Sequence, residues 1–305
     1  GMVKIRNAGS QYLGIRAGGV DLSQATRKLR VDSLAVQANH TWNVVSGIEF
    51  VVGATAFSQG GYAVSLTNGG TVTFLGSGLT LGNSSSFTGT LAAGSAGLSL
   101  YAGSGASYSI GGSTTTTSTL TKSGNGLYTV GGTNTFAGGV RLTAGTLALA
   151  SSQAIGTSGT ITFLGGALRF TSANRGDYSP RYSTANGQAI KLDTNGQSVT
   201  HATALRGSGS TITKLGSGTL TLSATNTYTG GTAVSGGTLN ITGRLGNGSY
   251  AGSIANAGAL RANNRACGAC SRRSMIGSRC RGWMSKGFRS QMASICTARL
   301  KWRKR

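Results

Sequence analysis

Few side chains in this sequence could support acid–base or metal chemistry. Among the 305 residues there are only five carboxylates and two histidines. These seven residues are Asp21, Asp32, Glu49, Asp177, Asp193, His40 and His201. Polysaccharide-active enzymes need carboxylates that converge on one bond or one metal ion. Asp177 and Asp193 could share a face of a repeating fold, and His201 follows them, but we interpret all three as isolated turn residues. The sequence therefore predicts a protein that is not an enzyme.

Motifs for nucleophilic catalysis, phosphate binding and metal binding are missing as well. The sequence has no G-x-S-x-G elbow, no G-x-G-x-x-G loop and no Walker motif, and it lacks the Asp ligands of the Gly-rich calcium nonapeptide. Cys267 and Cys270 form a C-x-x-C pair, but Cys280 and Cys296 do not form a second one. This spacing does not match a zinc site. We predict no metal and no cofactor.

Arg175, Gly176 and Asp177 spell a tripeptide of the kind that integrins bind. It lies near Pro180, the only proline in the chain, on a segment that we expect to be a loop. Three-residue matches are common by chance. We therefore keep adhesion through this tripeptide as an alternative to an ordinary solvent-exposed loop.

Positive charge is concentrated at the C-terminal end of the sequence. The formal net charge is +23, and residues 261–305 contain 13 lysines and arginines, no acidic residue and all four cysteines. This segment has neither strand alternation nor a helical apolar stripe, so we predict a disordered tail or the product of a shifted reading frame. A native tail of this charge would bind polyanions without sequence specificity. We predict no specific nucleic-acid partner.

An internal repeat dominates the rest of the chain. Residues 120–149 align without gaps with residues 212–241, which lie 92 positions further along. Alternating stretches such as residues 219–222, separated by Gly-containing turns, indicate strands. The repeat predicts strands stacked coil upon coil, with about 20 to 25 residues per coil. The repeat positions that we single out are Lys122, Gly124, Gly126, Asn134, Phe136, Gly138, Gly139, Lys214, Gly216, Gly218, Asn226, Tyr228, Gly230 and Gly231.

These patterns predict an all-β fold, a right-handed parallel β-helix (β-solenoid), followed by the disordered tail. We expect residues 1–44 to form an N-terminal cap or the first coils, residues 45–260 the solenoid, and residues 261–305 the tail. We expect Asn134 and Asn226 at turns, where their amides bond the backbone and could stack as a ladder. No apolar run is long enough to span a membrane, and the N-terminus lacks the apolar run of a secretion signal.

The pattern T-K-x-G-x-G-x-L-x-L-x-x-x-N-x-(aromatic)-x-G-G, ending in G-T-L, resembles the autotransporter-associated β-strand repeat of type V secretion passengers. Residues 212–241 follow it nearly throughout, and residues 120–149 depart from it at Tyr128 and Val130. The resemblance implies a β-helical passenger, secreted or exposed at the cell surface beyond an outer membrane, that acts as a structural stalk or an adhesin.

Several alternatives and partners follow from this interpretation. The implied partners are glycans or proteins on host or neighbouring cells, and other copies of the chain that associate end to end. A polysaccharide-active or carbohydrate-binding β-helix is the first alternative, with Phe136 and Tyr228 as a possible sugar-stacking row. Polyanion binding through the basic tail is the second.

Overall fold

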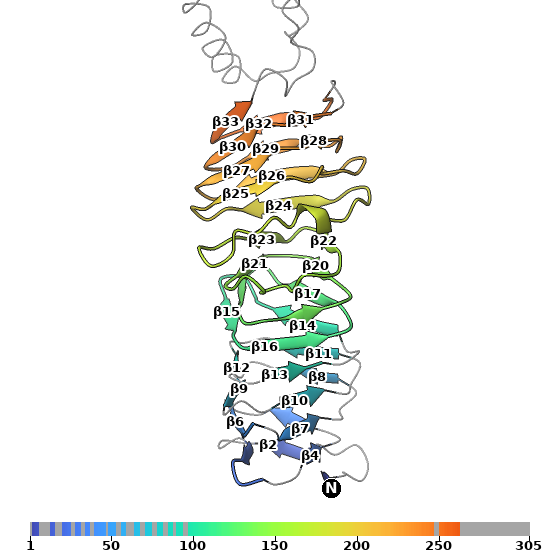
Figure 1. Cartoon of the computed structure of the whole chain (residues 1–305), viewed down its shortest axis with the longest axis vertical. Helices are drawn as coiled ribbons and strands as arrows, with labels where there is room; N and C mark the ends of the chain where they lie inside the picture. The colour runs from blue at the N-terminus through green and yellow to red at the C-terminus, as the bar shows by residue number, and fades with distance from the viewer. Residues whose placement is uncertain are drawn as a thin grey trace, which may run out of the picture.

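The computed structural model describes residues 97–246 and 250–262 without a break, and before them the strands and a few adjoining residues between residues 2 and 93. The described chain is a parallel β-solenoid, with 51% of the described residues in strands and 2% in helix. Figure 1 shows the strands wound around one long axis, from the blue N-terminal coils to the orange coils before residue 263. The predicted solenoid fold is therefore confirmed.

Each turn of the chain contributes strands to sheets that run along this axis. A seven-stranded sheet consists of β1 (Met2–Ile5), β4 (Lys28–Val31), β7 (Glu49–Val52), β10 (Thr71–Phe74), β13 (Thr90–Ala92), β16 (Ser113–Thr116) and β19 (Thr135–Phe136). A six-stranded sheet consists of β8 (Ala56–Ser58), β11 (Gly78–Leu81), β14 (Gly97–Tyr101), β17 (Leu120–Ser123), β20 (Val140–Leu142) and β22 (Ile161–Phe163). Near the N-terminus, β2 (Leu13–Ile15) pairs with β5 (Leu34–Val36).

A twelve-stranded sheet, called the long sheet below, runs through the whole described solenoid. It consists of β3 (Val20–Leu22), β6 (His40–Val44), β9 (Val64–Thr67), β12 (Ser85–Phe87), β15 (Ser107–Ile110), β18 (Leu127–Val130), β21 (Thr146–Leu149), β23 (Ala167–Arg169), β24 (Ala189–Asp193), β26 (Thr211–Leu215), β29 (Thr232–Val234) and β32 (Ile254–Asn256).

Two further sheets belong to the C-terminal part. The four-stranded sheet consists of β25 (Ser198–His201), β27 (Thr219–Leu222), β30 (Thr238–Ile241) and β33 (Ala259–Ala262), and a two-stranded sheet of β28 (Thr225–Asn226) and β31 (Arg244–Leu245). A single 3-10 turn, η1 (Ser179–Arg181), with Pro180 in its first turn, interrupts the described strands. Within the described residues, no helix has the length and apolarity that crossing a membrane requires.

Parallel register places apolar side chains above one another in the interior. In β27 and β30, Leu220 pairs with Leu239 and Leu222 pairs with Ile241, and all four side chains are buried. Because successive side chains of a strand point to opposite faces, the T-L-T-L pattern puts the leucines in the core and the threonines on the surface. Register partners in neighbouring coils lie as few as 19 residues apart, as Leu127 and Thr146 do, and up to 26 apart, as Met2 and Lys28 do.

The N-terminal strands belong to the same solenoid. In the segment predicted as cap or first coils, β1, β2 and β3 pair in parallel with β4, β5 and β6. Of these, β4 and β6 pair in turn with β7 and β9, which follow residue 45. Trp42 and Phe50 are buried here and pack edge to face, with ring centroids 5.3 Å apart. At the other end, Arg261 and Ala262 complete β33, and the predictions for the remaining tail residues lie outside the described residues.

The two copies of the repeat lie along one axis but on different sheets. Lys122 of β17 lies in the six-stranded sheet, whereas the aligned Lys214 of β26 lies in the long sheet. Similarly, β18 belongs to the long sheet and the aligned β27 to the four-stranded sheet. Each strand of the second copy therefore lies one sheet further along the coil than its counterpart in the first.

Candidate functional site

Lys122 lies inside the solenoid, although lysine usually stays in water. Its side chain has no exposed surface, and it follows the buried Leu120 on the inward face of β17. The ammonium nitrogen Nζ donates to the carbonyl oxygens of Ser123 at 2.6 Å and Gly124 at 2.7 Å in its own turn. It also donates to the carbonyl oxygen of Ala144 at 3.3 Å in the following coil. The ammonium therefore ties a turn to the coil that stacks on it.

Lys214 makes the same contacts in the second copy. It is fully buried, and its Nζ donates to the carbonyl oxygens of Leu215 at 2.9 Å, Gly216 at 2.8 Å and Gly236 at 3.1 Å. Burial lowers the pKa of Lys122 from 10.5 to about 8, because the charged ammonium loses water. Burial also lowers the pKa of Lys214, although the nearby Asp193 carboxylate acts in the opposite direction.

The glycines that follow each lysine allow the turns to stack closely. Gly124 and Gly145 adopt φ angles of 68° and 62°, and a Cβ atom on Gly145 would lie 2.3 Å from the Gly124 carbonyl oxygen and 2.4 Å from that of Gly126. In the second copy, the corresponding residues are Gly216, Gly218 and Gly237. The T-K-x-G-x-G pattern thus combines a donor for the turn carbonyls with the space that the next turn needs.

The paired glycines of the repeat serve a similar close approach. A Cβ atom on Gly138 would lie 2.6 Å from the Ser118 carbonyl carbon, and one on Gly230 would lie 2.4 Å from the Ser210 carbonyl oxygen. Their partners, Gly139 and Gly231, face the coil that follows.

Asn134 and Asn226 connect three consecutive coils each. The Asn134 Oδ1 atom accepts the N–H of Thr114 at 2.8 Å in the preceding coil, and its Nδ2 atom donates to the Ala154 carbonyl at 2.8 Å in the following coil. Asn226 forms the equivalent bonds with its own neighbours, Leu205 at 3.0 Å and Arg244 at 3.1 Å. Both amides bond to the backbone of adjacent coils and not to each other.

The repeat aromatics are enclosed in the core. Phe136 and Tyr228 are each 1% exposed, so neither ring can stack on a sugar in this conformation. The Tyr228 hydroxyl lies 2.6 Å from the Thr232 Oγ1 atom, which lies 2.7 Å from the Tyr250 hydroxyl. In the first copy, the aligned residues are Phe136 and Val140. The second copy therefore has two hydrogen-bonded hydroxyl groups, on Tyr228 and Thr232, at positions where the first copy has none.

Asp177, the last residue of the tripeptide, uses its carboxylate within the fold. Its Oδ1 atom accepts the N–H of Ser179 at 2.8 Å, and its Oδ2 atom accepts the N–H of Ala202 at 2.8 Å. Oδ1 also lies 3.1 Å from the His201 Nδ1 atom, an electrostatic contact without the alignment of a hydrogen bond. Burial raises the pKa of Asp177, but these donors outweigh burial and hold the pKa well below its usual range. Arg175 is exposed to solvent.

His201 joins the partly exposed Asp177 to the buried Tyr182 in an Asp–His–Tyr chain. His201 has no exposed surface, and its Nε2 atom lies 3.0 Å from the Tyr182 hydroxyl. Its ring also packs edge to face against Phe170 and Tyr182. Burial raises the pKa of Tyr182 well above 10, so the phenol keeps its proton. Because His201 and Tyr182 are both buried, these three side chains present no nucleophile to a substrate.

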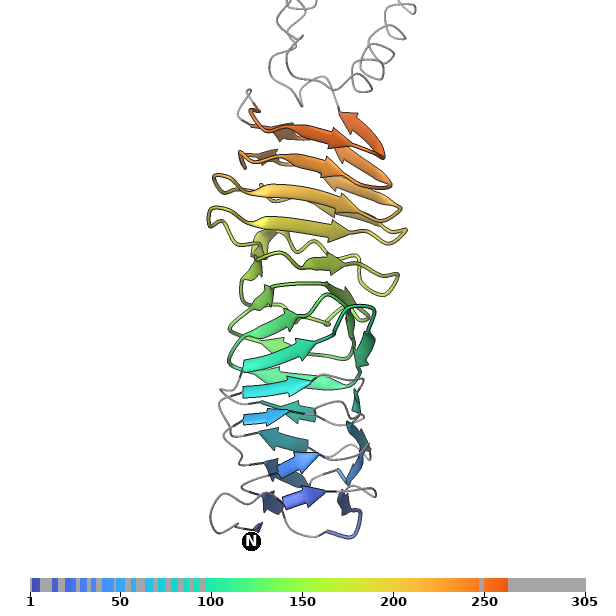
Figure 2. The same cartoon turned by 180° about the vertical axis from the view of Figure 1, so that it is seen from behind.

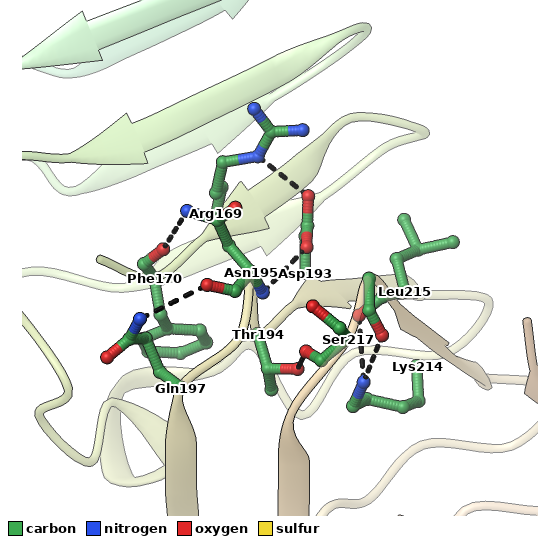
Figure 3. A network of polar contacts seen from close by, with 10 residues as sticks. Arg169, Phe170, Asp193, Thr194, Asn195, Gln197, Lys214, Leu215 and Ser217 are labelled. Atoms are coloured by element: carbon green, nitrogen blue, oxygen red, sulfur yellow. Dashed lines mark hydrogen bonds and ion pairs between the residues drawn. The ribbon is translucent and has the colours of Figure 1, made fainter. Parts of the chain in front are cut away.

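Asp193 pairs with Arg169 of the preceding coil. The two residues are register partners of β24 and β23, and the Arg169 Nε atom lies 2.7 Å from the Asp193 Oδ2 atom. Asp193 also accepts the N–H of Asn195 at 2.9 Å. Figure 3 shows this network beside the buried Lys214. Across the part of the chain that the structure describes, no three His, Cys, Asp or Glu residues gather in a possible metal site.

Arg181 makes polar contacts with the backbone that the sequence did not predict. Its guanidinium group donates to the carbonyl oxygens of a single loop in the preceding coil, at 2.8 Å to Gly159, 2.7 Å to Gly156 and 3.2 Å to Ile155, and also to that of Ser158. The repeat pattern gives no signal for this contact, because Arg181 lies between the two copies.

The comparisons with known proteins agree with this geometry. The model of the passenger-associated-transport-repeat family matches residues 120–149 and 212–241, the two segments that contain the buried lysines. The chain therefore contains two passenger-associated-transport repeats. The passenger-associated-transport repeat indicates an autotransporter passenger-associated domain, which implies a secreted or cell-surface parent protein. No curated protein and no solved structure matches the chain significantly.

Proposed function

We propose that this passenger-repeat chain is a non-enzymatic structural stalk in a surface-exposed autotransporter passenger. The observation that carries the proposal is how the described solenoid uses its polar side chains. Lys122, Lys214, Asn134 and Asn226 all bond to backbone groups of neighbouring coils. Groups that hold coils together are not free to bind a ligand, so they support a mechanical role.

The carboxylates support the same proposal. Asp193 is bonded to Arg169, and Asp177 accepts backbone N–H groups and faces the buried His201. A glycosidase needs two carboxyl groups that flank one open groove, one of them free to give or take a proton. At strand spacings of about 4.8 Å, the twelve stacked strands of the long sheet would extend a stalk by roughly 50 Å.

Surface display tests the stalk proposal. The full chain would be placed between a secretion signal and the translocation unit of a host autotransporter, with an epitope tag at its N-terminal side. We expect antibody and protease to reach the tag on intact cells, and we expect no gain in adherence or glycan hydrolysis over the host passenger without the chain. Increased adherence would favour an adhesin, and increased hydrolysis an enzyme.

An adhesive role for the tripeptide or the repeat aromatics receives less support. The Asp177 carboxylate is already bonded, and Phe136 and Tyr228 are enclosed. Glycans or proteins of host or neighbouring cells therefore remain proposed partners of other surfaces, and a glycan array with the purified chain would identify them. Polyanion binding remains a sequence prediction, because it depends on tail residues outside the described ones.

End-to-end association is a further proposed partnership. Among the described strands, β32 and β33 each pair on one side only, with β29 and β30. Unpaired strand edges readily recruit another strand. Sedimentation velocity over a range of concentrations would test this: end-to-end pairing predicts species that grow with concentration, and a single concentration-independent species would contradict it.

A further inference from the structure

The sheets of the solenoid change between residues 150 and 202. The seven-stranded sheet ends with β19, and the six-stranded sheet ends with β22. The four-stranded sheet begins only with β25, so the long sheet alone continues through this region. Figures 1 and 2 show short arrows and long connecting loops here, between the regular coils on either side.

Backbone pairing is sparse in the coil that contains η1. The last strand of the six-stranded sheet, β22, meets this coil in one isolated bridge, from Ile161 to Tyr182. In the long sheet, β23 and β24 share three register pairs, as β26 and β29 do, and the ladder between β23 and β24 is the one strand ladder that crosses the coil in the described residues. Fewer ladder bonds mean a weaker interface between neighbouring coils, and in a solenoid each coil is stabilised mainly by its neighbours.

Side chains replace the missing backbone bonds on the N-terminal side of this coil. Arg181 spans the gap and bonds to the loop at residues 155–159. Asn174 reaches the same preceding coil, where its Nδ2 atom donates to the Ser151 carbonyl at 2.6 Å. A planar guanidinium with several donors suits this task, because one side chain can satisfy several carbonyl groups.

Other side chains bond the coil to its C-terminal neighbour. The Asp177 carboxylate accepts the N–H of Ala202, and the Ser179 Oγ atom accepts the N–H of Thr203 at 3.0 Å. His201, at the end of β25, contacts both Asp177 and Tyr182. Side chains on both faces of the coil therefore supplement the ladders of the long sheet, where other coils also have ladders in the other sheets.

We propose that residues 171–188, called the joint below, divide the solenoid into two cooperative segments and that Arg181, Asp177 and His201 couple them. The N-terminal segment ends with β23, and the C-terminal segment begins with β24. Loss of a side-chain contact at the joint should leave each segment folded but let the two segments open independently. The joint does not depend on the chain being a stalk, so failure of either idea leaves the other standing.

Hydrogen exchange of the full chain, followed by mass spectrometry, tests the joint. In the unmodified protein, the slowest-exchanging amides of β18 and β27 should exchange at similar rates, because the segments open together. In Arg181→Ala and His201→Phe, the two sets of amides should differ in rate by at least tenfold. Arg181→Lys, which keeps the charge but loses the planar set of donors, should also separate them.

Arg141→Ala is the matched control, because Arg141 is an exposed arginine on β20, outside the joint. It should leave the two rates similar. Retention of the β-sheet circular dichroism spectrum identifies variants that still fold, and Asp177→Asn replaces any variant that does not. Equal loss of protection in both segments, unchanged rates in the joint variants, or separate rates already in the unmodified protein would each overturn the proposal.

Discussion

At the scale of single residues, the buried lysines are the most specific feature of the repeat. Lys122 donates to three partly buried carbonyl groups, of which that of Ser123 also accepts the N–H of Ala102. Lys122→Met fills a similar volume but removes the ammonium donor from these carbonyl groups. We expect a loss of about 1 to 3 kcal/mol in the free energy of unfolding, measured by denaturant titration. Arg141→Met, on the surface of β20, should change it much less, and equal losses would contradict the proposed role of Lys122.

The pKa of Lys122 gives this contact a characteristic pH dependence. Its folded-state pKa of about 8 lies below the usual unfolded value near 10.4, so the unfolded chain binds more protons between these values. The free energy of unfolding should therefore rise from pH 8 to about pH 9.5, and this rise should be smaller in Lys122→Met. Above pH 10 the free energy of unfolding should fall. Buried tyrosines such as Tyr182 have raised pKa values and keep their protons in the folded chain, whereas the same tyrosines lose them in the unfolded chain. Denaturation at pH 7.5, 9 and 10.5 measures both slopes.

Asp177 gives a dependence of the same sign at acid pH, where the free energy of unfolding should also rise with pH. Its folded-state pKa is lowered, so its stabilising contribution is present above the unfolded value near 3.9 and is lost as the pH falls below it. Asp177→Asn should lower the thermal midpoint at pH 7 and should lose less of it between pH 5 and pH 2.5. An unaltered acid profile in the variant would contradict the assignment of this carboxylate to the fold.

At the scale of elements, the two copies show which substitutions must occur together. Thr232→Val alone should destabilise the second copy by about 1 to 3 kcal/mol, because the enclosed Tyr228 hydroxyl loses a partner. The double variant Tyr228→Phe with Thr232→Val reproduces the Phe136 and Val140 pair of the first copy and should regain part of this loss. A double-mutant cycle measures the coupling, and strictly additive effects would contradict it.

Phe136→Tyr is the reciprocal experiment in the first copy. Val140 offers no hydroxyl group there, so the added phenol would be enclosed in the core beside an apolar side chain. We expect a loss of stability from Phe136→Tyr that Val140→Thr partly restores. Recovery in the first copy would mean that the pairing depends on local chemistry and not on the sheet in which the strand lies.

At the scale of the whole molecule, the repeat was sufficient to predict a solenoid with coils of the right length. Alternation in stretches such as Thr219–Leu222 distinguishes inward from outward positions, and the structure buries both leucines. The same alternation cannot tell which sheet a strand joins, so the different sheets of Lys122 and Lys214 were not predictable. It also hides lysines that point inward, because a polar residue is normally assigned to the surface.

The joint could not be predicted from the sequence for a different physical reason. Arg181 bonds to residues 22 to 26 positions earlier in the chain, and Asp177 to one 25 positions later. These pairs belong to neither copy of the repeat and follow no period. Their geometry depends on where the irregular coil places its backbone, which only the folded chain determines.

The one-sheet displacement between the copies has a consequence for tandem duplication. A chain lengthened by further copies at the same displacement would carry its equivalent strands on successive sides of the rod. With three strands per coil, a third copy would occupy the remaining side and a fourth would return to the first. Duplication would then distribute identical outward side chains along a spiral instead of a single stripe. A neighbouring molecule would therefore contact the same side chains whichever side of the rod it approached.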